Sequence, residues 1–95
     1  MELFVARVEL HGVSHDEAKY VRLHELMLAV GFYRTILGDD GITYHMLTAE
    51  YFMQSNKSLD EVLNLAKTAA NSIATKNGVF ISQLKLAKWD GLIPS

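Results

Sequence analysis

The chain has 95 residues, 49% of them hydrophobic and 21% charged, which is the composition of a single globular domain and excludes a disordered segment. It contains no cysteine, and this excludes disulfide scaffolds, cysteine-ligated zinc, iron–sulfur clusters and thiol catalysis. Nine Lys and Arg against eleven Asp and Glu give a formal net charge of −2, which disfavours a bulk electrostatic hold on nucleic acid but leaves a local patch open.

The first third of the chain predicts a strand followed by a helix. Residues 2–10 have apolar side chains at alternating positions, which is typical of a strand. Its expected core face consists of Phe4, Ala6, Val8 and Leu10. Ser14 and Glu17 have the spacing of a capping box, which predicts the start of a helix. An apolar stripe at helical spacing extends this helix to about Val30, and Gly31 ends it.

The rest of the chain predicts two strands, a loop, a helix and a last strand. Residues 32–37 and 42–47 form the two strands, because the Asp-Gly step between them is a hairpin signal. Residues 48–57 are expected to form a loop. A second capping box and apolar positions at helical spacing predict a helix over residues 58–75, and residues 79–87 form the last strand.

The order βαββαβ, with right-handed crossovers, predicts one α+β domain over residues 1–95. The expected architecture is ferredoxin-like, a four-stranded antiparallel sheet with both helices on one face. The other face of such a sheet is open. On the last strand, the residues expected under the helices are Phe80, Ser82, Leu84 and Leu86.

The length of the loop at residues 38–41 decides which hairpin side chains reach the open face. A two-residue turn, or a three-residue turn with a bulge, places Thr35 opposite His45 and Leu37 opposite Thr43. A four-residue loop would shift this register and move His45 to the helix side of the sheet.

The open face expected from the first register is apolar, and monomers rarely expose such a contiguous patch. We therefore expect a homodimer, either with its sheets face to face or with the C-terminal tail, residues 88–95, paired with the partner subunit. The alternative is a tail that folds back over its own sheet. The residues expected at the dimer interface are Leu3, Val5, Tyr33, Leu37, Val79, Ile81, Trp89 and Leu92.

Polar side chains concentrate on the expected hairpin. Cleavage of RNA through its 2′-hydroxyl needs an acid–base group that titrates near neutral pH and a cation for the phosphorane charge. His45 is the candidate acid–base group, with Arg34 or Arg7 as the cation. Alternatively, Asp39 and Asp40 hold a divalent ion such as Mg²⁺ that activates water, although Asp-Asp-Gly is also an ordinary hairpin turn. The candidate substrate-binding residues are Thr35, Thr43, Tyr44 and Lys85.

Five short segments carry a resemblance to a known family. They are Arg7-Val8-Glu9-Leu10-His11, Gly31-Phe32-Tyr33-Arg34-Thr35-Ile36, Asp39-Asp40-Gly41-Ile42-Thr43-Tyr44-His45, Thr48-Ala49-Glu50-Tyr51 and Trp89-Asp90-Gly91-Leu92. In these segments the chain resembles the GhoS-like endoribonuclease antitoxins of type V toxin–antitoxin systems, a family of small bacterial and prophage proteins. The resemblance implies a ferredoxin-like domain similar to the small nucleases of CRISPR adaptation. It also implies cleavage of the messenger RNA of a small membrane-active toxin, so that the partner is a transcript and not a toxin protein. We expect no DNA partner.

Two functions are therefore expected from the sequence. The first is an antitoxin-type endoribonuclease that cleaves single-stranded RNA as a homodimer. The alternative is a non-catalytic dimeric binding module that holds a protein partner on its apolar sheet face. No apolar run approaches the ~20 residues of a membrane helix and no signal peptide is visible, so we expect a cytoplasmic protein without membrane contact.

Overall fold

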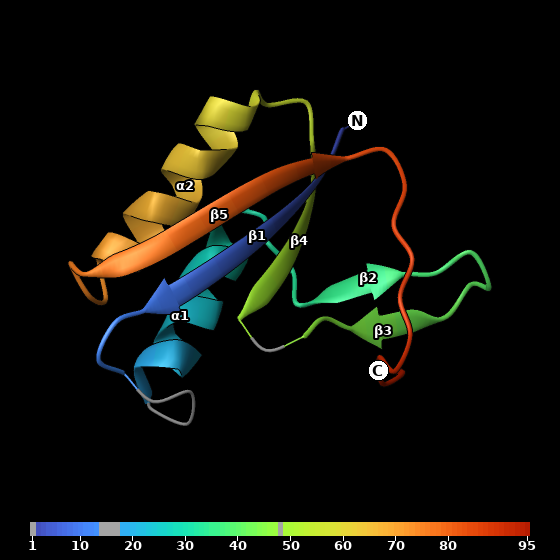
Figure 1. The fold of residues 1–95 in the computed structure, drawn as a ribbon, viewed down its shortest axis with the longest axis horizontal. Coiled ribbons are helices and arrows are strands. Elements are labelled where there is room, and N and C mark those ends of the chain that lie inside the picture. The colour runs from blue at the N-terminus through green and yellow to red at the C-terminus, as the bar shows by residue number, and fades with distance from the viewer. Residues whose placement is uncertain (1, 14–17, 48) are drawn as a thin grey trace.

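The structure is a computed structural model that describes residues 2–13, 18–47 and 49–95 (Figure 1). Three of its strands form an antiparallel sheet in the order β4-β1-β5, and β2 and β3 form a separate two-stranded sheet. The α+β class is therefore confirmed. In chain order the elements are β1 (Glu2–Leu10), α1 (Ala18–Ala29), β2 (Thr35–Leu37), β3 (Thr43–His45), β4 (Glu50–Ser55), α2 (Leu59–Asn71) and β5 (Asn77–Leu84).

The four-stranded sheet expected from the sequence is replaced by a three-stranded sheet and a hairpin. The strand beside β1 is β4, which lies within the segment expected to be a loop. Its side chains Tyr51 and Met53 are buried under the helices, and this apolar pair takes the place expected for residues 42–47. A fourth strand is reduced to one bridge, in which Tyr33 and Phe52 exchange two N–H···O bonds of 2.7 Å.

Both helices cover the same face of the three-stranded sheet (Figure 1). The predicted core face of β1 is confirmed, because all four of its expected residues are buried. From α2, Ala66 and Ala70 contribute small, fully buried side chains that let the helix pack close to the strands. The larger side chains of α1 fill the rest of this layer. They are Tyr20, Leu23 and Met27.

The start of α2 follows the sequence prediction. Ser58 Oγ accepts a hydrogen bond of 3.2 Å from the Glu61 N–H, and Glu61 Oε1 accepts one of 3.0 Å from the Ser58 N–H. This capping box satisfies two backbone donors that a helix start leaves free. The helix ends at Asn71, a turn earlier than expected. The other predicted capping box, Ser14 and Glu17, lies outside the described residues.

The faces of β5 are the reverse of the expectation. Ala6 lies opposite Ile81 and Val8 opposite Val79, so Val79 and Ile81 point to the helix side and pack against the core. Phe80 consequently lies on the open face and is 66% exposed. Since a slip of one residue turns every side chain of a strand over, apolar residues on both faces of this strand left the choice undecided in the sequence.

The hairpin loop has the three-residue, bulged form. The Gly38 N–H donates to the Ile42 carbonyl at 2.8 Å, the Gly41 N–H donates to the Gly38 carbonyl at 3.0 Å, and Gly41 has a φ of +80°. The register expected for this loop is confirmed, with Thr35 opposite His45. The hairpin does not join the open face of the main sheet, however, because β2 and β3 form a sheet separate from β4, β1 and β5.

The C-terminal tail runs from the end of β5 back to the hairpin of the same chain (Figure 1). Pro94 forms a bridge with Tyr44, the His45 N–H donates to the Ile93 carbonyl at 2.9 Å, and the Ser95 N–H donates to the Thr43 carbonyl at 2.9 Å. The tail thus folds back on its own chain, on β3 rather than over the sheet. In the described part of the chain, no helix is long and apolar enough to span a bilayer.

Candidate functional site

The face of the three-stranded sheet opposite the helices has no element packed over most of it (Figure 1). Strand alternation and register give this open sheet face its side chains. They are Leu3, Val5, Arg7 and Glu9 from β1, Glu50, Phe52 and Gln54 from β4, Phe80, Ser82 and Leu84 from β5, and Tyr33 beside Phe52. The face therefore combines aromatic rings with a few charged groups.

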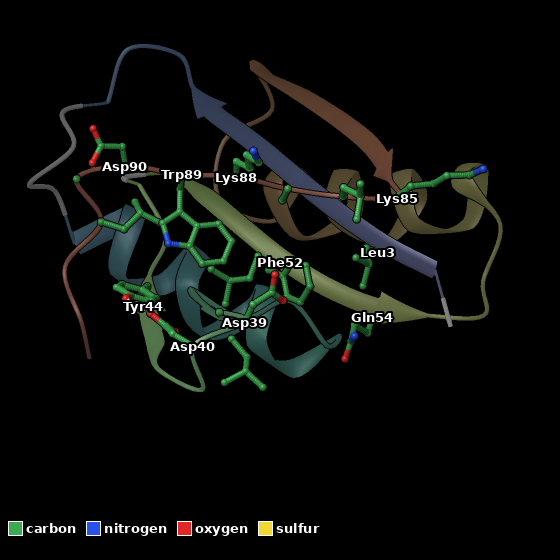
Figure 2. A pocket seen from close by; sticks show the side chains of 17 residues that line it. Leu3, Asp39, Asp40, Tyr44, Phe52, Gln54, Lys85, Lys88, Trp89 and Asp90 are labelled. Carbon is green, nitrogen blue, oxygen red and sulfur yellow. Dashed lines mark hydrogen bonds between the residues drawn. The ribbon is translucent and has the colours of Figure 1, made fainter.

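A groove of about 810 Å³ lies where the hairpin and the tail meet one end of the open sheet face. We call it the hairpin groove. Figure 2 shows three aromatic side chains around it, Tyr44 from β3, Phe52 from β4 and Trp89 from the tail. Charged side chains stand at its rim. They are Lys85, Lys88, Asp39, Asp40 and Asp90.

Asp40 holds the hairpin side of the groove together. Its Oδ2 accepts a hydrogen bond of 2.7 Å from the Tyr44 hydroxyl, and its Oδ1 accepts one of 2.9 Å from the Ile42 N–H. Both bonds lower the pKa of the Asp40 carboxyl, and the bond from Tyr44 has the larger effect. The same Tyr44–Asp40 bond raises the pKa of Tyr44. Trp89 packs edge-on against Tyr44 at a ring distance of 5.7 Å.

This bonding gives Asp40 a structural role in the turn. Each of its carboxylate oxygens accepts one hydrogen bond, and Asp39 beside it is exposed. Across residues 2–13, 18–47 and 49–95, no group of three or more His, Asp or Glu side chains is placed to hold a metal ion. Among the described residues, no third carboxylate or imidazole side chain is placed beside Asp39 and Asp40 to complete a Mg²⁺ site.

The three candidate catalytic residues are not brought together. Arg7 lies on the open sheet face, where its Nε is 3.6 Å from Glu50 Oε2. His45 is exposed on the hairpin opposite Thr35. Arg34 precedes Thr35, so strand alternation turns its side chain to the opposite side of the hairpin from His45. Chemistry that combines Arg34 with His45 would therefore need a different hairpin register.

The other candidate substrate and interface residues are spread over several surfaces. Thr35 and Thr43 are half-buried on the hairpin, and Lys85 lies exposed at the end of β5. Val79 and Ile81 face the core, which removes them from the outward surface expected for them. The remaining candidate interface residues lie on the open sheet face (Leu3, Val5, Tyr33), the hairpin (Leu37) and the tail (Trp89, Leu92).

A polar cluster between α1 and β4 was missed in the sequence. The Tyr51 hydroxyl lies 2.6 Å from His24 Nδ1, and Arg34 is close enough to perturb both groups electrostatically. Arg34 Nε is buried without a hydrogen-bond partner in the described structure. The available signal was the position of His24 directly after Leu23 and four residues after Tyr20, which places it at the border of the buried helix stripe.

This cluster predicts a pH dependence of stability. Burial, and then the Arg34 guanidinium, lower the pKa of His24 below its ordinary value of 6.5. The unfolded chain therefore binds a proton at His24 where the folded chain does not, and the free energy of unfolding falls as the pH drops below that value. The slope stays under about 1.4 kcal/mol per pH unit, because His24 changes the number of bound protons by at most one.

Urea unfolding at pH about 7.5, 6.5 and 5.5 measures this slope. His24→Gln removes the titrating ring and is expected to flatten the curve over this range. His45→Gln, which changes an exposed histidine, is the matched control and should keep the wild-type slope. An identical slope in wild type and His24→Gln would contradict the prediction.

A second hollow, of about 530 Å³, lies at the other end of the open sheet face. We call it the Arg7 hollow. Its lining includes Arg7, Glu9 and His11 from β1 and the residue after it, and Gly78 and Phe80 from β5. One cation, one histidine and one exposed aromatic ring thus share a concave surface.

Comparison with known proteins adds no assignment to these surfaces. No family model matches the chain, and the searches of curated proteins and of solved structures gave no match. The functional argument therefore depends on the residues and their geometry.

Proposed function

We propose that this chain is an antitoxin-type endoribonuclease that binds and cleaves single-stranded RNA. The observation that carries the proposal is the hairpin groove, whose lining combines the aromatic rings of Tyr44, Phe52 and Trp89 with two lysines, Lys85 and Lys88. Proteins recognise single-stranded RNA by stacking unpaired bases on aromatic rings while cations contact the phosphates. The groove has both kinds of group within one concave surface.

The open sheet face extends this surface away from the groove. From Leu3 to Glu9 the face is about 20 Å long at the usual rise of a strand. Phe52 lies opposite Val5 and Phe80 lies opposite Arg7, so the two rings stand beside the middle of this track. A short RNA segment laid along β1 would therefore meet both aromatic rings.

The net charge of −2 limits how this binding can work. Stacking, rather than bulk attraction to phosphate, must supply most of the affinity. Three cations, Arg7, Lys85 and Lys88, line the track. The logarithm of the RNA affinity is expected to fall linearly with the logarithm of the salt concentration. Each cation contributes about −0.7 to the slope of this line, so the expected slope is about −2.

The strand order supports a ferredoxin-like origin for the fold. If the Tyr33 bridge is counted as a reduced strand, the order in the sheet is Tyr33, β4, β1, β5. Both helices lie on one face, as in a ferredoxin-like domain. We propose that the chain is such a domain, with its second strand shortened and the β2–β3 hairpin inserted.

The proposal predicts that binding depends on Trp89. Trp89→Ala is expected to weaken the binding of single-stranded RNA by about tenfold or more, since one base–aromatic stack is worth about 1–3 kcal/mol. Fluorescence anisotropy of a labelled, fully 2′-O-methylated RNA measures affinity without cleavage. Lys85→Ala with Lys88→Ala should flatten the salt slope by about 1.4.

Lys19→Ala is the matched control, because Lys19 is exposed on α1 on the other side of the molecule. It should leave both affinity and salt slope unchanged. If Trp89→Ala binds RNA with the wild-type affinity, the groove is not the RNA site. A wild-type chain that binds no RNA would refute the function.

We also propose that the chain acts as a homodimer and that the RNA it cleaves is the transcript of a toxin. Support for the dimer comes from Ile93, which is 70% exposed on the tail and lines neither the hairpin groove nor the Arg7 hollow. The transcript follows from the family resemblance of the sequence. Light scattering of the purified chain tests the dimer. If the chain is a monomer at the concentration of the RNA assays, the dimer is refuted.

A second candidate function has a specific observation in its favour. Phe80 and Tyr33 are 66% and 53% exposed on the open sheet face, and exposed apolar patches also mark protein interfaces. A non-catalytic binding module would use this face for a protein partner. It becomes the better account if the wild-type chain neither binds nor cleaves RNA.

A further inference from the structure

We propose that the Arg7 hollow is the catalytic centre for RNA cleavage, in which His11 takes the proton of a ribose 2′-hydroxyl and Arg7 binds the adjacent phosphate. The inference rests on the proposed function and specifies where its chemistry takes place. It moves the centre from the hairpin, where the sequence indicated it, to the far end of the open sheet face.

The His11 ring is placed between two strands. Its backbone N–H donates to the Lys76 carbonyl at 3.0 Å, which fixes the residue at the end of β1. Nδ1 lies 3.8 Å from Glu9 Oε1, so a carboxylate faces one ring nitrogen. The other nitrogen, Nε2, lies over Gly78, 3.8 Å from where a Cβ would stand. Since Gly78 has no side chain, Nε2 borders the open floor of the hollow.

Arg7 and Phe80 supply the other two parts of a nucleotide site. They are direct neighbours across β1 and β5, and both are largely exposed. Glu50 meets Arg7 at the Nε side, and a guanidinium has five N–H donors, so donors remain for a phosphate. The Phe80 ring is a platform on which the neighbouring base can stack.

The four histidines of the chain differ in their surroundings. His24 is bonded to Tyr51, and His45 stands on the hairpin opposite Thr35. His11 shares the Arg7 hollow with an arginine. Residue 15 lies outside the described ranges.

The backbone at the rim of the hollow is strained. Ala49 has a φ of +64°, a left-handed conformation that side chains other than glycine rarely adopt. Its carbonyl accepts the Val8 N–H at 3.1 Å, which ties the rim to β1. Such conformations concentrate at functional sites, where the surrounding structure holds them in place.

The reaction balances without a metal or a co-reactant. The 2′ oxygen forms a bond to phosphorus while His11 Nε2 takes its proton, and the bond between phosphorus and the 5′ oxygen breaks. The 5′ oxygen leaves with a proton from water, and the His11 imidazolium then returns its proton to the hydroxide that remains. The products are a 2′,3′-cyclic phosphate and a 5′-hydroxyl end. Arg7 stabilises the charge that develops on the phosphorane oxygens.

Single-turnover cleavage of a labelled single-stranded RNA tests the inference. His11→Gln is expected to slow cleavage by about 100-fold or more, the usual contribution of a proton-transfer group. RNA affinity, read by anisotropy with the 2′-O-methylated probe, should stay near the wild-type value. The pH–rate profile should lose one ionisation in His11→Gln, with Glu9 and Glu50 as the other titratable groups that face the site. EDTA should leave the rate unchanged.

Arg7→Lys provides a second variant that keeps the charge and loses the fork of donors, and it should also slow cleavage. Lys19→Gln, on the far side of α1, is the matched control for both. Circular dichroism shows whether each variant is folded. A folded His11→Gln variant with the wild-type rate would overturn the inference and leave the proposed function standing.

Two further outcomes separate the inference from the proposed function. Loss of cleavage in His45→Gln with a normal rate in His11→Gln would return the centre to the hairpin and overturn the inference alone. Cleavage that leaves no 2′,3′-cyclic phosphate would overturn the inference alone, whereas a wild-type chain that binds RNA without cleaving it would overturn the inference and the endoribonuclease activity together.

Discussion

Replacement of Phe4 by alanine is expected to lower the free energy of unfolding by about 3–5 kcal/mol. Phe4 is fully buried on β1, the middle strand of the sheet, with both helices packed over that face. The truncated side chain would leave a cavity that strands paired on both sides cannot close. The free energy of unfolding of a folded domain is typically about 5–15 kcal/mol, so the variant would lose a large share of its stability.

Urea unfolding followed by circular dichroism measures this loss. Phe80→Ala is the matched control, because it removes the same ring from a side chain that is 66% exposed, and it should cost less than about 1 kcal/mol. Phe4→Leu should fall between the two. Equal losses for Phe4→Ala and Phe80→Ala would contradict the assignment of the two faces of the sheet.

Features that depend on short-range chemistry were predictable from the sequence. The capping box of Ser58 and Glu61 needs only two residues three apart, and both of its hydrogen bonds are present. The hairpin register followed in the same way from the turn, because Gly41 supplies the left-handed backbone of a bulged loop. The core face of β1 was predictable because Phe4, Ala6, Val8 and Leu10 alternate with positions that include the charged residues Arg7 and Glu9.

Features that depend on competition between segments were not predictable. Residues 42–47 and 50–55 both alternate, and only packing against α1 decides that Tyr51 and Met53 take the place beside β1. The face of β5 is a similar case, since Val79, Ile81 and Phe80 are all apolar. In both places a local pattern fits two arrangements, and the tertiary structure selects one of them.

The candidate site shows the same limit. Arg34 and His45 are close in sequence on one hairpin, and this suggested a joint role. Strand alternation separates their side chains, and Arg34 meets His24 and Tyr51 from distant parts of the chain instead. The pairing of Arg7 with Phe80 required the β1–β5 register, so the Arg7 hollow had no signal in the sequence.

Tyr51→Ala is expected to destabilise the chain by about 3–5 kcal/mol, and Tyr51→Phe by about 1–3 kcal/mol. The ring of Tyr51 is fully buried, so its removal leaves a cavity between β4 and α1. The hydroxyl has a separate role. Burial raises the pKa of Tyr51 well above its ordinary value, so the hydroxyl stays protonated and is hydrogen-bonded to His24 Nδ1 at 2.6 Å.

A double-mutant cycle separates these two contributions. Tyr51→Phe and His24→Ala each break the 2.6 Å bond, so the double variant should lose less stability than the sum of the single losses. A coupling of about 0.5–3 kcal/mol in urea unfolding is the expected result. Additive losses would show that the hydroxyl and the imidazole contribute independently.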